Sequence, residues 1–167
     1  MRTKNPSCII TTYIEKTETV LDLGCGYGEP FVDAKFKLLV GVDAWKKVFK
    51  LPEYDLVIYE NIKKIGKLFA PNSFDVVTAI DVIEHLPKED GFKLIKDMER
   101  IAKKKVLIFT PKIWTENRDS FENPVYWSYG NKNYNLHRSL WTEKDFIELG
   151  YDFLRCQEGY ILAGKLK

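Results

Sequence analysis

Short runs of Val, Ile and Leu recur along the chain, and each ends at or just before an acidic residue, a glycine or a proline. Because the runs are apolar throughout rather than alternating with polar residues, they predict parallel strands that are covered on both faces. The five predicted strands span residues 19–24, 37–43, 55–60, 74–80 and 105–110.

Helical patterns lie before, among and after these strands. Phe92, Ile95, Met98 and Ala102 recur at helical spacing, which predicts an amphipathic helix before the fifth strand. The predicted helices span residues 6–16, 88–103 and 142–149, and a closing antiparallel hairpin is predicted from residues 151–156 and 160–164. This order predicts an α/β fold, doubly wound, in one domain that covers residues 1–167.

The composition excludes several other classes of protein. The chain has 167 residues, of which 45% are hydrophobic, and its formal net charge of +2 is too small to indicate a nucleic-acid partner. The sequence has no signal-peptide core, and no apolar run approaches the roughly 20 residues that span a bilayer. Cys8, Cys25 and Cys156 are scattered, so neither a disulfide framework nor a cysteine-ligated zinc site is predicted. We expect a cytoplasmic protein without membrane insertion.

The first predicted strand ends in a glycine-rich turn, Asp22-Leu23-Gly24-Cys25-Gly26-Tyr27-Gly28. Glycines at such a turn let a ligand approach the backbone closely. Their spacing is GxGxG rather than the GxGxxG of dinucleotide-binding folds. Asp43 lies 21 residues after Asp22, at the end of the second strand, where an acid can accept hydrogen bonds from ribose hydroxyls. The alternative is a plain tight turn, with Asp43 capping the next helix.

Three segments follow in order: VLDLGCGYG, GVD and FDVVTAIDVIEHL. Together they resemble the class I S-adenosylmethionine-dependent methyltransferases, from about residue 19 to about residue 111. The resemblance implies a Rossmann-like, mostly parallel sheet of seven strands with an antiparallel closing hairpin, and S-adenosyl-L-methionine as the cofactor. Two features depart from many relatives: only 18 residues precede Thr19, and Asn61 stands where aspartate is common.

The resemblance also assigns cofactor-binding residues. The glycine turn holds the methionine part, Asp43 and its neighbour Ala44 contact the ribose, residues after the third strand lie near the adenine, and residues after the fourth line the pocket. The implied set is Asp22, Gly24, Cys25, Gly26, Gly28, Asp43, Ala44, Glu60, Asn61, Ile80 and Asp81.

Methyl transfer needs a base mainly when the acceptor is a hydroxyl or an ammonium group. The candidates are Asp81, Glu84, His85 and His137, and we predict catalytic roles for Asp81, His85 and His137. In an alternative interpretation, Glu84 and His85 have no chemical role and only shape the turn before the long helix. In a third interpretation, all four bind a divalent ion, an arrangement that resembles the metal site of small-RNA 3′-terminal methyltransferases. We expect His137 to lie near the pocket, and we expect no metal to be required.

Residues 111–141 form a long stretch with seven aromatic residues, which predicts that some of them form an acceptor pocket. We therefore expect a small-molecule or saccharide-type acceptor, and the sequence does not indicate an oligomeric state. Three alternatives stay open: metal-assisted methylation of an RNA 3′ end, a non-catalytic module that binds the adenosyl cofactor, and a Rossmann-type binder of another nucleotide. The seven aromatics are Trp114, Phe121, Tyr126, Trp127, Tyr129, Tyr134 and Trp141.

Overall fold

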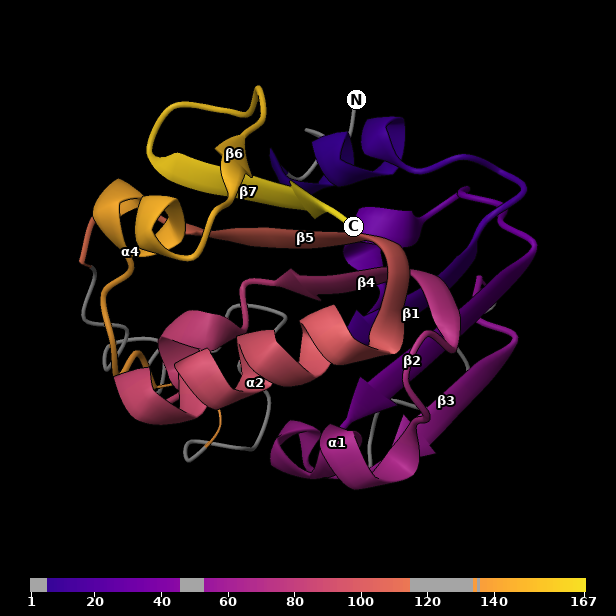
Figure 1. Ribbon diagram of the computed structural model, residues 1–167. Coiled ribbons are helices and arrows are strands. Elements are labelled where there is room, and N and C mark those ends of the chain that lie inside the picture. Colours follow the sequence, from indigo (N-terminus) through magenta and orange to yellow (C-terminus); the bar gives the residue numbers. More distant parts are fainter. Residues whose placement is uncertain (1–5, 46–52, 115–133, 135) are drawn as a thin grey trace, which may run out of the picture.

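The computed structural model describes residues 6–45, 53–114, 134 and 136–167, in which seven strands form one sheet with helices on both faces (Figure 1). The strand order is β3-β2-β1-β4-β5-β7-β6. The first five strands are parallel to one another, and β7 runs antiparallel to both β5 and β6. The strands are β1 (Thr19–Leu23), β2 (Leu38–Asp43), β3 (Leu56–Tyr59), β4 (Phe74–Ile80), β5 (Ala102–Pro111), β6 (Asp152–Phe153) and β7 (Tyr160–Leu166).

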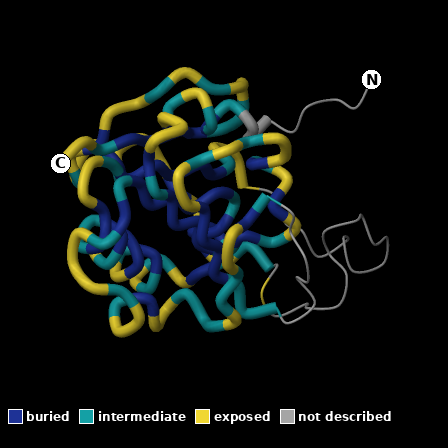
Figure 2. Tube along the Cα trace, turned by 90° about the vertical axis from the view of Figure 1, so that its right-hand side faces the viewer, coloured by how far each residue is buried: buried dark blue, intermediate teal, exposed yellow. Residues whose placement is uncertain are grey.

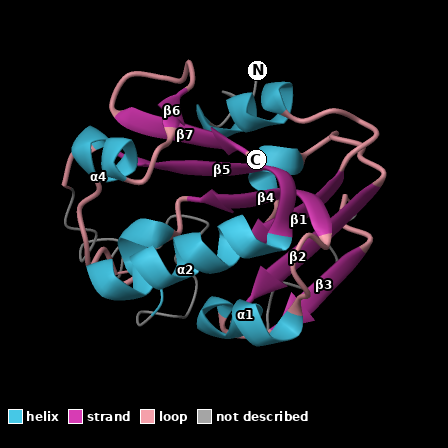
Figure 3. Cartoon of the chain, in the orientation of Figure 1, coloured by secondary structure: helices cyan, strands magenta, loops and turns pink. Residues whose placement is uncertain are grey.

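Helices cover the sheet on both sides, as Figure 3 shows. Three α-helices pack on one face, and the first two 3-10 helices pack on the other. Within the described residues, the α-helices with given bounds are α1 (Ile65–Leu68), α2 (Lys88–Ile101) and α4 (Glu143–Glu148). The 3-10 helices are η1 (Pro6–Tyr13), η2 (Glu29–Phe31), η3 (Ile62–Lys64) and η4 (Ile83–His85).

The central strands bury side chains on both faces, which is why their sequences read as continuous apolar runs. In β5, Val106 and Ile108 pack toward the α-helices, whereas Leu107 and Phe109 pack toward the 3-10 helices. The dark blue segments of Figure 2 mark this buried centre. The α/β fold with a mostly parallel sheet and an antiparallel hairpin is therefore confirmed.

The boundaries of α2 and β5 differ from the prediction. The helix ends at Ile101 rather than at residue 103, and β5 begins at Ala102. The three lysines that follow the helix, 103–105, would suit its C-terminus, but they lie in β5, where Lys104 and Lys105 pair with the buried Glu18 at 3.5 and 3.0 Å. The pattern of apolar residues could not reveal this partner, because Glu18 is distant in sequence.

Other elements are shorter or tighter than predicted. The lead-in helix is the 3-10 helix η1, and β6 contains two residues instead of six. Helix α4 begins after Thr142, whose side chain forms a capping box with Asp145, as its sequence suggests. Among the described helices, none has the length and apolar character required to cross a membrane.

The strand order fixes where a ligand would bind. From β1 the chain forms β2 and then β3 on one side of β1. It then crosses back, and β4 pairs with the other side of β1. In open α/β sheets, ligands bind beyond the carboxyl ends of the strands at such a reversal. That position lies between the residues that follow β1 and those that follow β4.

Candidate cofactor site and catalytic cluster

The glycine-rich turn follows β1 and folds over the end of β2. Gly24, Gly26 and Gly28 have φ values of 71°, 47° and 70°, which side chains rarely tolerate. The backbone N–H groups of Gly24 and Cys25 donate to the carbonyl oxygen of Val42 at 2.7 and 3.2 Å. A Cβ on Gly26 would meet no heavy atom nearer than Gly24 O at 3.9 Å, so a ligand has room to approach the backbone there.

The turn also packs against the corner that follows β4. A Cβ on Gly24 would lie 2.5 Å from Cγ2 of Val82, so only glycine lets the two segments meet this closely. The two strands are neighbours in the sheet, with Leu23 opposite Ala79. The predicted cofactor turn and the predicted catalytic residues therefore lie side by side.

Asp43 connects the end of β2 to the glycine turn. Its Oδ2 accepts a hydrogen bond from the backbone N–H of Gly26 at 2.9 Å, and its Oδ1 accepts one from Trp45 at 2.7 Å. Burial raises the pKa of Asp43, and the two backbone hydrogen bonds oppose that shift. A carboxylate has about four lone-pair sites, so this half-buried group retains capacity for a ribose hydroxyl. The adjacent Ala44 is half-buried as well.

Asp22 lies beneath the turn, in the core. It accepts hydrogen bonds from the Tyr54 hydroxyl at 2.6 Å and from Thr78 Oγ1 at 2.7 Å, and it is 2% exposed. Burial raises the pKa of Asp22 to about 7, although the two hydroxyl groups lower it in part. No sequence pattern indicates either partner, because Tyr54 and Thr78 come from segments distant from Asp22. These hydrogen bonds hold Asp22 in the core beneath the glycine turn, and Asp22 thereby supports the turn.

Glu60 and Asn61 follow β3, beside Asp43. The backbone N–H of Glu60 donates to Asp43 O at 3.1 Å. The Asn61 side chain caps η3 by accepting from Lys63 N at 3.0 Å, and Glu60 Oε1 accepts from Asn61 N and from Lys64 Nζ. These hydrogen bonds lower the pKa of Glu60. Both residues thus lie at the strand end where the resemblance expects the adenine.

Ile80 and Asp81 form the corner after β4. Ile80 is buried, and Asp81 adopts a left-handed conformation with φ 51°, which is uncommon outside glycine. The backbone N–H of Asp81 donates to Phe109 O at 2.9 Å, and this bond anchors the corner on β5. Burial raises the pKa of the Asp81 carboxyl group. Such local strain is a feature of functional sites.

Glu84 lies in η4, one turn beyond Asp81, and is buried. Its Oε2 accepts a hydrogen bond from Thr110 Oγ1 at 2.9 Å. No described residue donates a hydrogen bond to its other oxygen, Oε1. Burial, and then the nearby Asp81 carboxylate, raise the pKa of Glu84.

His137 lies next to His85, although the two are far apart in sequence. Their ring centroids are 5.0 Å apart. One oxygen of Glu84 and one nitrogen of each histidine all lie within 4.8 Å of one another. Of the four residues proposed from sequence as a metal set, the structure therefore groups these three, and Asp81 stands beside them.

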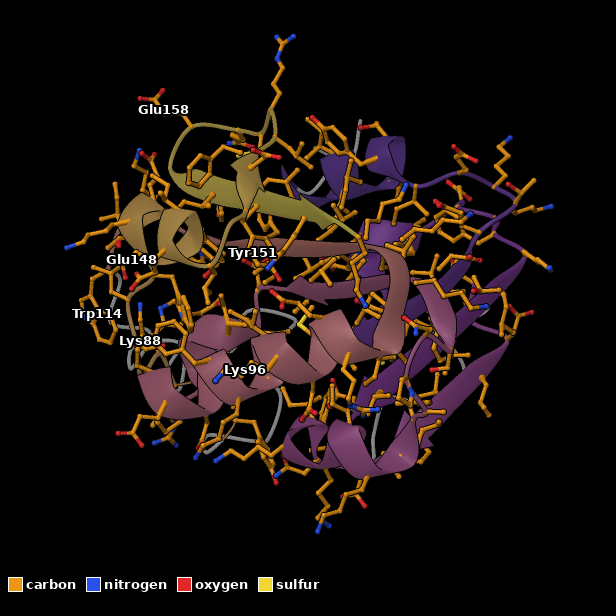
Figure 4. The ribbon with its side chains drawn as sticks, viewed as in Figure 1. Lys88, Lys96, Trp114, Glu148, Tyr151 and Glu158 are labelled. Carbon is orange, nitrogen blue, oxygen red and sulfur yellow. The ribbon has the colours of Figure 1, made fainter. Side chains whose placement is uncertain are left out.

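The predicted aromatic pocket is only partly within the described residues. Trp141 belongs to the hydrophobic core, where its Nε1 donates to Ile83 O at 3.2 Å. Trp114 is exposed and lies with its ring centroid 6.2 Å from that of His137; in Figure 4 it appears on the same side of the molecule as Lys88. Tyr134 is exposed, and the remaining four aromatics lie outside the described residues.

Several solved structures share this fold. A protein of Pyrococcus horikoshii is 19% identical over 93% of this chain and 84% of its own, with a TM-score of 0.65. An S-adenosylmethionine-dependent methyltransferase of Archaeoglobus fulgidus is 19% identical over 94% of this chain and 90% of its own, with a TM-score of 0.64. The magnesium protoporphyrin IX methyltransferase of Synechocystis, solved with bound S-adenosylhomocysteine, is 15% identical over 95% of this chain and 78% of its own, with a TM-score of 0.60.

The sequence comparison gives the family. Comparison with curated proteins finds no match. The sequence profile of the methyltransferase domain matches residues 21–110, which is more than half of the chain and includes the glycine turn, Asp43 and the corner after β4. The chain therefore belongs to the class I S-adenosylmethionine-dependent methyltransferase family, and its cofactor is S-adenosylmethionine.

Proposed function

We propose that this chain methylates a hydroxyl group of a small-molecule acceptor, of which a saccharide is the class we favour. One observation carries the proposal: groups that can accept a proton gather beside the glycine turn. Asp81, Glu84, His85 and His137 all lie at or just beyond the carboxyl end of β4, whose corner packs on Gly24. A hydroxyl acceptor has to lose a proton, whereas acceptors that carry no such proton need no base.

The cofactor would be held by the glycine turn, Asp43 and Ala44, with Glu60 and Asn61 beside them. When bound, S-adenosylmethionine supplies an electrophilic methyl group on a sulfonium sulfur. The open space over Gly26 and the spare lone pairs of Asp43 fit such a ligand. The chain's own task is to orient the acceptor oxygen, to exclude water and to remove the proton from that oxygen, for which Asp81, His85 and His137 are the proposed groups.

The test is a transfer assay with S-adenosylmethionine that carries a tritiated methyl group. The acceptor panel contains saccharides, small alcohols and phenols, small amines, and an RNA oligonucleotide that ends in a 3′ diol. We expect label in a small hydroxyl compound. Label only in amines would contradict the hydroxyl assignment. If none of the panel is labelled although the cofactor binds, the non-catalytic module becomes the better account.

A pair of variants tests the proton-accepting role of Asp81. Asp81→Asn removes the charge but keeps a residue type that tolerates the left-handed conformation. Asp33→Asn is the matched control, because Asp33 is exposed and also left-handed, with φ 63°. We expect kcat for the hydroxyl acceptor to fall about 100-fold or more in Asp81→Asn and to stay unchanged in Asp33→Asn.

Metal-assisted methylation of an RNA 3′ end is the second candidate function. The approach of His137 to Glu84 and His85 favours it, since these are the side chains that the sequence resemblance relates to that metal site. The net charge of +2 gives it no support, because nucleic-acid binding relies on basic surfaces. Label that enters only the RNA oligonucleotide in the panel above would establish this alternative.

A further inference from the structure

The strongest unassigned feature is the cluster of Glu84, His85 and His137. Two imidazoles that share one cation through nitrogen at about 2.1 Å have ring centres about 4.5–5.3 Å apart. The ring centroids of His85 and His137 are 5.0 Å apart, which lies within that interval. The three candidate ligand atoms lie within 4.8 Å of one another, so small side-chain rotations would give the spacing of about 3.0–3.5 Å found around one ion.

A second, independent observation comes from the buried carboxylate of Glu84. This side chain is 3% exposed, and Thr110 satisfies only its Oε2. Within the described residues, no donor has hydrogen-bond geometry to Oε1, although the backbone N–H groups of Glu84 and Val82 are near enough to lower the pKa of the carboxyl group. A buried oxygen without a donor costs free energy and calls for an explanation, and a bound cation supplies one.

The backbone fixes His137 near this carboxylate without any ion. Arg138 N and Ser139 N both donate to Glu84 O, at 2.7 and 3.1 Å. Ser139 Oγ donates to Ile83 O at 3.2 Å, and the buried Trp141 is anchored on the same carbonyl. The residues directly after His137 are therefore tied to η4, so the ligand set is preorganised by the fold.

The type of ligand indicates the class of cation. Two imidazoles and one carboxylate are a donor set for transition metals such as Zn²⁺, Mn²⁺ or Fe²⁺, whereas Mg²⁺ and Ca²⁺ prefer oxygen alone. The Asp81 carboxyl group is near enough to interact electrostatically with Glu84, and it adds negative charge beside the cluster. We propose that Glu84, His85 and His137 bind one divalent transition-metal cation, with its remaining positions open to solvent or acceptor oxygen.

This proposal reverses the expectation from sequence that no metal is required. Cation binding itself does not depend on the acceptor. Its consequence for catalysis, however, rests on the proposed function: a hydroxyl oxygen bound to the cation would lose its proton more readily, with no change in the oxidation state of the metal. His85 and His137 would then act as ligands and not as bases, so Asp81 or solvent would accept the proton.

The test is a titration with Co²⁺, followed by visible absorption. It uses the 167-residue chain after metal has been removed with EDTA and the EDTA dialysed away. Elemental analysis after dialysis against Zn²⁺ gives the stoichiometry. We expect about one ion per chain and cobalt bands typical of bound imidazole. In His137→Ala the affinity should fall at least about 100-fold, because loss of an outer-sphere partner alone costs about 10–100-fold.

Two controls separate ligand loss from general damage. Leu140→Ala changes an exposed residue of the same segment, and Glu99→Gln removes a carboxylate that pairs with Lys165 elsewhere; both should bind Co²⁺ like the original chain. Glu84→Gln keeps the size of the side chain and an acceptor for Thr110, so it tests the proposal even if His137→Ala fails to fold. We expect Glu84→Gln to lose binding as well.

If the original chain does not bind about one Co²⁺ ion, the proposal is wrong. It is also wrong if Glu84→Gln and a folded His137→Ala both bind Co²⁺ as tightly as the original chain. Binding of S-adenosylhomocysteine is measured on the same samples. A chain that binds S-adenosylhomocysteine but no cobalt loses only the metal site. A chain that binds cobalt but methylates no hydroxyl compound loses only the proposed function.

Discussion

The Asp43 carboxylate accepts a hydrogen bond from the backbone N–H of Gly26, with Oδ2 and N 2.9 Å apart. This bond joins the end of β2 to the turn that follows β1. The same carboxylate also accepts from Trp45 N, so its position is fixed from two sides. The residue proposed to bind the ribose therefore also shapes the glycine turn proposed to hold the methionine part, so the two halves of the proposed cofactor site are joined by one carboxylate.

Gly26→Ala should weaken binding of S-adenosylhomocysteine at least tenfold. The new methyl group would enter the open space over the turn, and its positive φ would cost about 1–2 kcal/mol of stability. Gly159→Ala is the control, because Gly159 also has a positive φ and nothing within 4 Å of a Cβ. Both variants should lower the melting temperature similarly, and calorimetry should show an affinity loss only in Gly26→Ala. Equal affinities would make the glycine purely structural.

Gly91→Ala should destabilise the fold, although alanine normally stabilises a helix interior by about 0.5–1 kcal/mol relative to glycine. In α2, a Cβ on Gly91 would collide with Cζ2 of Trp141, which is fully buried and cannot move aside. Overpacking of this kind costs about 1–3 kcal/mol. Lys96→Ala, at an exposed position of the same helix, should change the free energy of unfolding in urea by less than about 0.5 kcal/mol. A Gly91→Ala variant more stable than the original chain would contradict this packing.

Asp22 should make stability depend on pH near neutrality. Burial raises its pKa to about 7, so between the ordinary carboxyl range and that value the folded chain holds a proton that the unfolded chain releases. The free energy of unfolding should therefore fall as pH rises through this interval, by up to about 1.4 kcal/mol per pH unit, and level off above it. Asp22→Asn should lose this component in urea unfolding between pH 5 and 8. Other titrating groups are common to both proteins, so parallel curves would disprove the assignment.

The positions of the central strands along the chain could be predicted because each of these strands carries its own signal. Buried parallel strands need apolar residues on both faces, and β4 begins and ends at the predicted residues. The end of α2 could not be predicted, since Lys104 and Lys105 suit a helix terminus equally well until their partner Glu18 is known. Contacts between distant segments decided that boundary.

The candidate site shows the same limit. Local motifs predicted the glycine turn and Asp43 as cofactor-binding residues, which stays a prediction. The sequence also led us to expect His137 near the pocket, and the structure brings its ring beside that of His85. The support of Asp22 by Tyr54 and Thr78 could not be predicted, because no spacing rule relates the three residues. Trp141 gave an ambiguous signal: an aromatic residue in a long loop suits an acceptor pocket and a core equally well, and only its packing on Gly91 distinguishes them.

The most direct test of the central claim is a calorimetric titration with S-adenosylhomocysteine of the original chain, Asp43→Ala and Asp55→Ala. Asp55 is the matched control, because its Oδ2 also accepts a backbone N–H, from Leu39 at 2.8 Å, but at the opposite end of β2. The account predicts one site per chain, an affinity at least tenfold weaker in Asp43→Ala, and an unchanged affinity in Asp55→Ala. No binding by the original chain, or equal affinities in all three proteins, would contradict it.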